Sequence, residues 1–211
     1  TPTPSSAASD VYKRQGCFIS GGFDTHEQQL RQLAAESNNV VISVQYRLAP
    51  EHTYPAAHDD AYNAVVAIRK MGSKYGGDTE RISLVGDSAG GHLALVTAMR
   101  LKQRQDWLPE RQILIYPMLD PHGSSVSYKA NATDYIITDK MLLSGFDMYL
   151  GDKNPEHIDA NPELNPLLCG DFRGLPPTSI ITAEFDPLRD EGEQLYRQLL
   201  KHGVEAHCER Y

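Results

Sequence analysis

The chain has 211 residues, 28 of them acidic and 20 of them lysine or arginine, so its formal net charge is −8. This length suits one domain with its own hydrophobic core, and the negative charge argues against nucleic acid as a partner. No apolar run reaches the roughly 18 residues that a membrane span needs. The spacing of Cys17, Cys169 and Cys208 predicts neither a metal site nor a disulfide framework, and it favours a reducing, cytoplasmic compartment.

The chain begins with TPTPSSAASDVYKRQ, a small, polar stretch without periodicity that is typical of a disordered tail. Residues 5–15 can also be back-translated into a string that resembles a transposase adapter used in sequencing libraries. We therefore expect residues 1–15 to be a non-native or disordered tail, and residues 16–211 to form the domain. Because Tyr211 stands inside a predicted strand, we expect both ends to be cut from a longer gene product.

Directly after this tail, Gly16 and Cys17 precede the bulky Phe18 in the stretch GCFISGGFDTH. A glycine followed by an aromatic residue can form a loop whose backbone N–H groups face a nucleophile and stabilise an oxyanion. The alternative for Gly16 and Cys17 is an ordinary glycine turn.

Strands and helices alternate through the rest of the chain. Apolar, β-branched runs predict strands, and the residues concerned are 38–47, 81–87, 112–117 and 178–185, with a more alternating run at 203–211. Helical patterns lie between them, at residues 26–36, 56–71, 89–104 and 191–202. The alternation predicts an α/β fold: a mostly parallel sheet with right-handed crossovers and helices on both faces. Residues 121–169 interrupt this order with an excursion that holds a helix around residues 138–150.

The motif G-x-S-x-G occurs at Gly86-Asp87-Ser88-Ala89-Gly90, between a predicted strand and a predicted helix. In that context the serine sits at the tip of a sharp turn, and glycines two positions away avoid a clash. We therefore predict that Ser88 is a nucleophile and that the Ala89 N–H group faces the developing oxyanion. The alternative is a serine that only caps the helix.

A carboxylate follows the predicted strand at 178–185. Asp186 stands at the carboxyl end of this strand, where open α/β sheets place their sites. It could orient a histidine and stabilise the imidazolium form. The alternative is that Asp186 only favours the start of the next helix, a role we expect for Asp190 and Glu191.

Taken in order, these segments resemble the bacterial hormone-sensitive-lipase-like (family IV) carboxylesterases of the α/β-hydrolase fold. The resemblance runs from Gly16 to Tyr211 and rests on several short stretches: GCFISGGFDTH, YRLAPEHTYPAAHDDA, GDSAGG, IYPMLD, NPLL and LPPTSIITAEFDPLRDEGE. It implies a serine hydrolase that cleaves short- to medium-chain esters through an acyl-enzyme and needs no cofactor or metal. It also implies a small-molecule ester as substrate, and a homodimer is possible.

The chain departs from this family in two places. The family's oxyanion motif is H-G-G-G, of which Gly16 and Cys17 match the last two positions, while Arg14 and Gln15 replace the first two. The family's general-base histidine follows the last matched strand, beyond Tyr211, so we expect the chain itself to be inactive. Two alternatives stay open: a non-catalytic small-molecule binder of the same fold, which the plant gibberellin receptors exemplify, and an amide or formamide hydrolase.

The histidines within the chain are poor replacements for that base. Chain order leaves His202 and His207, but His202 ends a predicted helix and His207 lies within a predicted strand. We expect His92 to pack against its surroundings, and His26 and His58 to be polar groups near helix starts.

Overall fold

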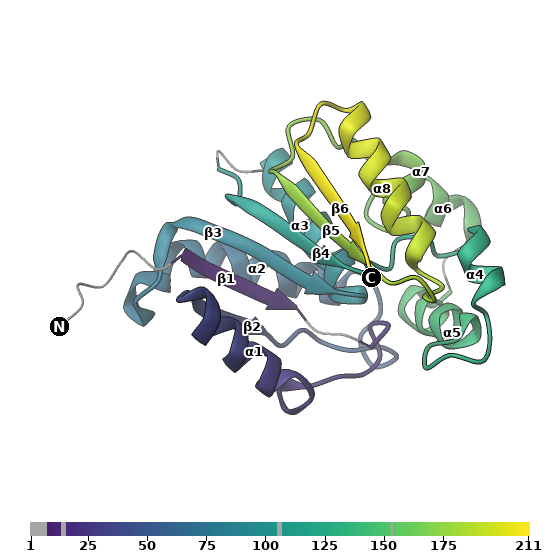
Figure 1. The fold of residues 1–211 in the computed structure, drawn as a ribbon, viewed down its shortest axis with the longest axis horizontal. Coiled ribbons are helices and arrows are strands. Elements are labelled where there is room, and N and C mark those ends of the chain that lie inside the picture. Colours follow the sequence, from purple (N-terminus) through teal and green to yellow (C-terminus); the bar gives the residue numbers. More distant parts are fainter. Residues whose placement is uncertain (1–7, 14–15, 105–106, 153) are drawn as a thin grey trace.

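Six parallel strands form the centre of the molecule (Figure 1). The computed structural model describes residues 8–13, 16–104, 107–152 and 154–211. The spatial order of the strands is β2-β1-β3-β4-β5-β6, and every neighbouring pair is parallel. Their bounds are β1 (Ala8–Lys13), β2 (Val40–Val44), β3 (Asp78–Asp87), β4 (Arg111–Ile115), β5 (Thr178–Thr182) and β6 (Ala206–Arg210).

Helices connect successive strands, and an excursion of four helices separates β4 from β5. No helix in the described ranges is both long and apolar enough to cross a bilayer. The connecting elements are α1 (Phe23–Ser37), α2 (Ala56–Met71), η1 (Gly72–Tyr75), α3 (Ala89–Arg104) and α8 (Arg189–Lys201). The excursion contains α4 (Val126–Ala130), α5 (Asp139–Leu150), α6 (Pro155–Asp159) and α7 (Pro166–Cys169), and α4 and α5 lie beyond the carboxyl ends of the strands (Figure 1).

The strand order explains why helices cover both faces. From β1 to β2 the chain moves one way along the sheet, and from β2 onward it moves the other way. Right-handed crossovers therefore place α1 on one face and α2, α3 and α8 on the opposite face. Consecutive residues of β3 show this: Leu84 packs in the cluster that holds residues of α2, α3 and α8, whereas Val85 packs against Leu30 of α1. The predicted α/β class and the helices on both faces are confirmed.

Strand β1 differs from the sequence prediction, which placed residues 1–15 outside the fold. Ala8–Lys13 pair with β2 on one side and with β3 on the other, inside the sheet. The segment carries no continuous apolar run, and such pairing is made by backbone groups that a hydrophobic pattern does not reveal. Whether this segment is native stays a prediction, and residues 1–7 and 14–15 lie outside the described residues.

Buried polar contacts fasten the excursion to the domain. The Arg100 guanidinium on α3, 5% exposed, donates to both carboxylate oxygens of Glu163 and to Asp59 on α2. The Glu163 carbonyl oxygen also lies 2.7 Å from Nε2 of His92 and 3.2 Å from Nε2 of His58. Residues around Glu163 therefore cannot move without breaking a buried network.

Candidate active site

The most favourable crevice in an open α/β sheet lies where neighbouring strands send their helices to opposite faces. Here that point falls between β1 and β3, because β1 leads to α1 and β3 leads to α3. The segment beginning at Gly16 follows β1, and Ser88 follows β3. The topology therefore brings the two predicted site segments to one edge of the sheet.

Ser88 has the backbone conformation of a tight strand-to-helix turn. Its φ angle is +52°, a left-handed value that a serine adopts only at a cost of about 1–2 kcal/mol. Three backbone hydrogen bonds hold it there: the Ser88 N–H group donates to the Ile115 oxygen at 2.9 Å, and its carbonyl oxygen accepts from His92 and Met118 at 3.2 and 3.1 Å. The strained turn is thus fixed between β4 and the first turn of α3.

The turn around Ser88 leaves little room for a side chain at Gly86 or Gly91. A Cβ on Gly86 would lie 2.2 Å from the Gly90 carbonyl oxygen, and a Cβ on Gly91 would lie 3.0 Å from Cβ of Pro117. The end of β3 and the start of α3 therefore approach more closely than any side chain at Gly86 would permit.

The loop after β1 turns as tightly. Gly16, Cys17 and Phe18 have φ angles of +125°, +52° and +66°, and the N–H groups of Ile19 and Ser20 both donate to the Gly16 carbonyl oxygen. Only glycine fits at Gly16, because a Cβ there would lie 2.4 Å from the Ser20 oxygen. Burial raises the pKa of the Cys17 thiol to about 11, so Cys17 presents a neutral thiol and its backbone.

Ser88, Asp186, Gly16 and Cys17 line one cavity of about 830 Å³. Ala89 is fully buried behind Ser88 as the first residue of α3, where backbone N–H groups lack partners within the helix. Four predicted site residues thus line one cavity, and the fifth, Ala89, directly follows Ser88 in the chain. The remaining lining residues are Ile19, Ser20, Gly21, Thr25, His26, Tyr116, Ile136, Ile137, Met141, Leu142, Ser144, Ala183 and Leu188.

Asp186 lies in a loop that the excursion holds in place. Burial raises the pKa of its carboxyl group, opposed by the hydrogen bond that its Oδ1 accepts from the Leu188 N–H group at 2.9 Å. The Asn131 amide donates to the Asp186 carbonyl oxygen at 3.2 Å, and the Ser127 hydroxyl donates to the Pro187 carbonyl oxygen at 2.6 Å. Two hydrogen bonds therefore join the loop that holds Asp186 to α4 and the residue that follows it.

Glu191 supports this site in a way that the sequence prediction missed. It lies in the first turn of α8, as expected, but it is fully buried and its carboxylate accepts the N–H groups of Leu119 and Asp120. The neighbouring Met118 N–H group donates to the Ser88 carbonyl oxygen. A signal was present: Glu191 falls four residues before Leu195 on the buried face of α8.

Two further polar side chains reach the cavity. Burial, with the nearby carboxylates of Asp87 and Asp186, raises the pKa of Tyr116 to about 12, so its phenol stays protonated. His26, expected only as a helix-start polar group, lies in the first turn of α1 with Nε2 3.6 Å from Oδ2 of Asp87 and Nδ1 2.8 Å from the Thr25 hydroxyl. Among the described histidines, His26 alone lines this cavity.

The other histidines lie elsewhere. His92 is buried between the carbonyl oxygens of Met118 and Glu163, and burial lowers its pKa, which fits the predicted packing role. His202 caps the end of α8 and contacts the Gln198 carbonyl oxygen, while His207 lies within β6 opposite Ser179. None of these three lines the cavity that holds Ser88.

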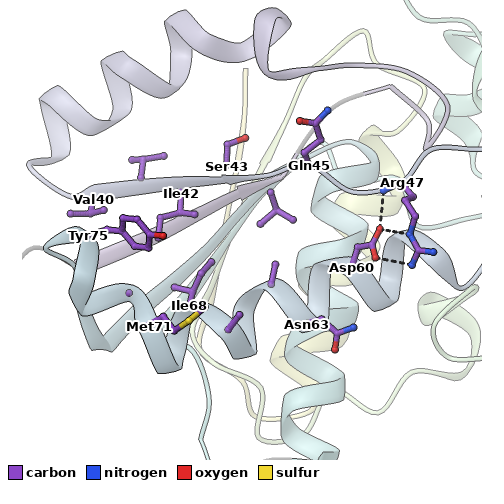
Figure 2. A pocket seen from close by; sticks show the side chains of 15 residues that line it. Val40, Ile42, Ser43, Gln45, Arg47, Asp60, Asn63, Ile68, Met71 and Tyr75 are labelled. Carbon is purple, nitrogen blue, oxygen red and sulfur yellow. Dashed lines mark hydrogen bonds and ion pairs between the residues drawn. The ribbon is translucent and has the colours of Figure 1, made fainter.

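A second cavity of about 930 Å³ lies between β2 and α2 (Figure 2). One end is apolar, with Val40, Ile42 and Tyr75, and the other end carries Arg47 paired with Asp60. The Asp60 carboxylate accepts hydrogen bonds from the Arg47 backbone and guanidinium. Neither Ser88 nor Asp186 lines this cavity, so the smaller one is the candidate active site.

A parallel sheet with a serine on a strained strand-to-helix turn and a half-buried aspartate two strands away defines the class of α/β hydrolases. The family model described as the alpha/beta hydrolase fold matches residues 11–211, and the chain belongs to this family.

The chain is similar to proteins named as esterases or ester hydrolases. Esterase LipI of Mycobacterium tuberculosis is 36% identical over 206 residues, which cover 96% of this chain and 63% of LipI. Ethyl acetate hydrolase of Pseudomonas putida is 32% identical over 195 residues, which cover 92% of this chain and 60% of that protein. A hyperthermophilic esterase from Pyrobaculum calidifontis superimposes with a TM-score of 0.92 at 40% identity, covering all of this chain and 67% of that structure. The chain thus spans less than two thirds of the length of these two curated relatives.

Proposed function

We propose that the protein hydrolyses carboxylic esters of small molecules through an acyl-enzyme on Ser88. One observation carries the proposal: Ser88, Asp186 and the Gly16–Cys17 turn line a single cavity at the carboxyl ends of the strands. The esterases to which the chain is similar support the choice of esters over amides.

Each residue has a role in this mechanism. The Ser88 hydroxyl oxygen attacks the ester carbonyl carbon, and the N–H groups of Gly16, Cys17 and Ala89 stabilise the oxyanion that forms. A histidine takes the Ser88 proton and passes it to the departing alcohol, while Asp186 orients that imidazole. Water, activated by the same imidazole, then attacks the acyl-enzyme and releases the acid.

The resemblance assigns the imidazole to a position beyond the last matched strand. For a chain of residues 1–211 we therefore expect both acylation and deacylation to be slow, because each step requires the base. An activated ester would then leave an acyl group on Ser88, and free imidazole in solution would speed its removal.

The test uses purified chain and p-nitrophenyl butanoate. We expect a butanoyl group on Ser88, detected by peptide mass spectrometry, and faster p-nitrophenol release on addition of imidazole. Ser88→Ala should remove the butanoyl group and leave only the p-nitrophenol release that imidazole itself causes, and this rate is the background. His26→Gln shows whether the cavity histidine serves as base, and we expect no effect on either signal. Absence of acylation in chain that is folded by circular dichroism contradicts the proposal.

Three finer expectations belong to the same proposal. Free Cys17, Cys169 and Cys208 favour a cytoplasmic location. The negative net charge favours a small-molecule partner over nucleic acid. Sedimentation velocity on the purified chain tests the homodimer.

A further inference from the structure

Tyr116 follows the strand that lies between the predicted nucleophile and the predicted acid. Ser88 follows β3, Tyr116 follows β4 and Asp186 lies in the loop after β5, and these three strands are neighbours in the sheet. The Ser88 N–H group donates to the oxygen of Ile115, the residue before Tyr116, and the Tyr116 N–H group donates to the Ile181 oxygen on β5. Hydrogen bonds on both sides therefore fix the end of β4 relative to the strands that lead to Ser88 and Asp186.

The backbone of Tyr116 is strained at this position. Its φ angle is +37°, a left-handed value that costs a residue with a side chain about 1–2 kcal/mol. Such a conformation persists only where the surrounding structure enforces it, and it is found most often at functional sites. Tyr116 lines the same cavity as Ser88 and Asp186, so the strain falls inside the candidate active site.

The Tyr116 hydroxyl is available as a hydrogen-bond donor. Burial and the carboxylates of Asp87 and Asp186 raise its pKa to about 12, so it keeps its proton at neutral pH. Within the ranges that the structure describes, no protein atom accepts a hydrogen bond from this hydroxyl. The two carboxylates oppose negative charge on any oxygen that approaches them, and a nearby donor offsets this effect.

The strand order also indicates which oxygen of an ester would lie on the side of Tyr116. Gly16 and Cys17, the predicted oxyanion donors, follow β1, which lies on the opposite side of β3 from β4. The alcohol oxygen must receive its proton from the imidazole that Asp186 orients. It therefore lies on the Asp186 side of Ser88, which is also the side of β4 and Tyr116.

We propose that Tyr116 is a further catalytic residue, whose hydroxyl donates a hydrogen bond to the departing alcohol oxygen of the ester. This inference rests on the proposed ester hydrolysis. As the Ser88 oxygen bonds to the carbonyl carbon, the bond from that carbon to the alcohol oxygen breaks, and its electron pair stays on the alcohol oxygen. The proton of Ser88 passes through the imidazole to the same oxygen, and Tyr116 keeps its own proton. The hydrogen bond stabilises the negative charge that develops before the proton arrives.

The test compares two esters that leave the same butanoyl group on Ser88, phenyl butanoate and p-nitrophenyl butanoate. Imidazole in the buffer serves as the base, and peptide mass spectrometry gives the initial rate of Ser88 acylation. The nitro group draws charge away from the leaving oxygen, so the phenyl ester depends more strongly on a hydrogen-bond donor. We expect Tyr116→Phe to slow acylation by the phenyl ester about tenfold, and acylation by the p-nitrophenyl ester by no more than about twofold. The ratio of the two rates does not depend on the fraction of folded protein.

Tyr135→Phe is the matched control. It removes the same hydroxyl from a tyrosine that is 44% exposed and stacks on Phe185, beside Asp186, but does not line the cavity. Its ratio of rates should equal that of the unaltered chain. Equal rates in Tyr116→Phe and the unaltered chain, or equal slowing with both esters, overturn the role of Tyr116 and leave the proposed ester hydrolysis standing. Absence of acylation by both esters in the folded, unaltered chain overturns both proposals.

Discussion

At the residue scale, the candidate site combines glycines that leave no room for a side chain with residues whose backbone conformation is strained. Ser88, Cys17 and Tyr116 all have left-handed φ angles, at +52°, +52° and +37°. Each such residue costs about 1–2 kcal/mol, so the surrounding hydrogen bonds must fix it. Three residues at the same cavity share this property, which is the pattern expected of a site that is held ready for its ligand.

Gly86 offers the sharpest test of this local geometry. Gly86→Ala places a methyl group 2.2 Å from the Gly90 carbonyl oxygen, and neither backbone segment can withdraw without opening the turn. We expect a loss of about 3 kcal/mol in the free energy of unfolding, measured by urea denaturation.

Gly76→Ala is the control for that substitution. Gly76 has a φ of +83° and no atom within 4 Å of the added Cβ, so only backbone strain of about 1 kcal/mol applies. Equal losses for the two variants would contradict the steric account of the turn.

The sequence was informative for residues whose role depends on local chain geometry. Gly86, Ser88 and Gly90 could be placed because a sharp strand-to-helix turn has a fixed spacing. Glu191 and Tyr116 could not, because their roles depend on segments that are distant in the chain: Glu191 on the backbone of Leu119 and Asp120, and Tyr116 on the approach of Asp186. Long-range contacts of this kind leave little trace in a single sequence.

At the element scale, α5 packs against the turn at Gly16–Phe18, which we predict to supply oxyanion donors. Phe18 is fully buried and stacks on Tyr149 of α5 with ring centroids 4.2 Å apart, while Gly145 faces Cys17. The loop that supplies two predicted oxyanion donors is therefore shaped by a helix of the excursion.

A double-mutant cycle measures this coupling. Gly145→Ala should destabilise the chain by about 2 kcal/mol, because its Cβ would lie 2.3 Å from Cβ of Cys17 and 2.8 Å from the Cys17 oxygen. Cys17→Gly removes the nearer atom, so Gly145→Ala should cost at least about 1 kcal/mol less in that background, measured by urea denaturation. Strict additivity would show that the helix and the loop are independent.

The buried network around Glu163 predicts a pH dependence. Burial alone would raise the pKa of Glu163, but the hydrogen bonds and charge of Arg100 outweigh it and lower the pKa below its ordinary value of 4.5. Since the folded pKa is the lower one, this stabilisation is present above pH 4.5 and is lost as the pH falls through the folded pKa.

Glu163→Gln is the test of that pH dependence. The variant should lose about 2 kcal/mol at pH 7 and less at acid pH, so the two stability curves converge as the pH falls. Glu156→Gln is the control, because Glu156 is an exposed glutamate in the first turn of α6, whereas Glu163 binds the buried Arg100 guanidinium. Parallel curves for Glu163→Gln and the unaltered chain would contradict the assignment.

The long helices were predictable, and the shorter elements were not. Residues 56–71 and 89–104 carry helical periodicity over their whole length, and α2 and α3 have these bounds. α4, α6 and α7 contain only four or five residues each, too few for a periodic signal. α4 forms where Ser125 caps it and where the Ser127 hydroxyl donates to the Pro187 carbonyl oxygen.

At the scale of the whole molecule, the sheet depends on a strand that the sequence prediction left out. β1 separates β2 from β3, and the neighbouring strands β1 and β3 lead to helices on opposite faces of the sheet. Without β1, β2 would lose its partner in the sheet, and the crevice between the loops after β1 and β3 would not exist.

Deleting residues 1–13 therefore distinguishes a tail from a structural strand. If these residues lay outside the fold, the deletion would leave the urea transition unchanged. Because Ala8–Lys13 pair on both sides, we expect instead the loss of a cooperative transition and of the near-ultraviolet circular dichroism of the buried aromatic residues. Deleting residues 1–7 keeps β1 and is the control, with a transition expected close to that of the full chain. A cooperative transition after the longer deletion would mean that β2 and β3 find another arrangement, and the site built between β1 and β3 would have to be reassigned.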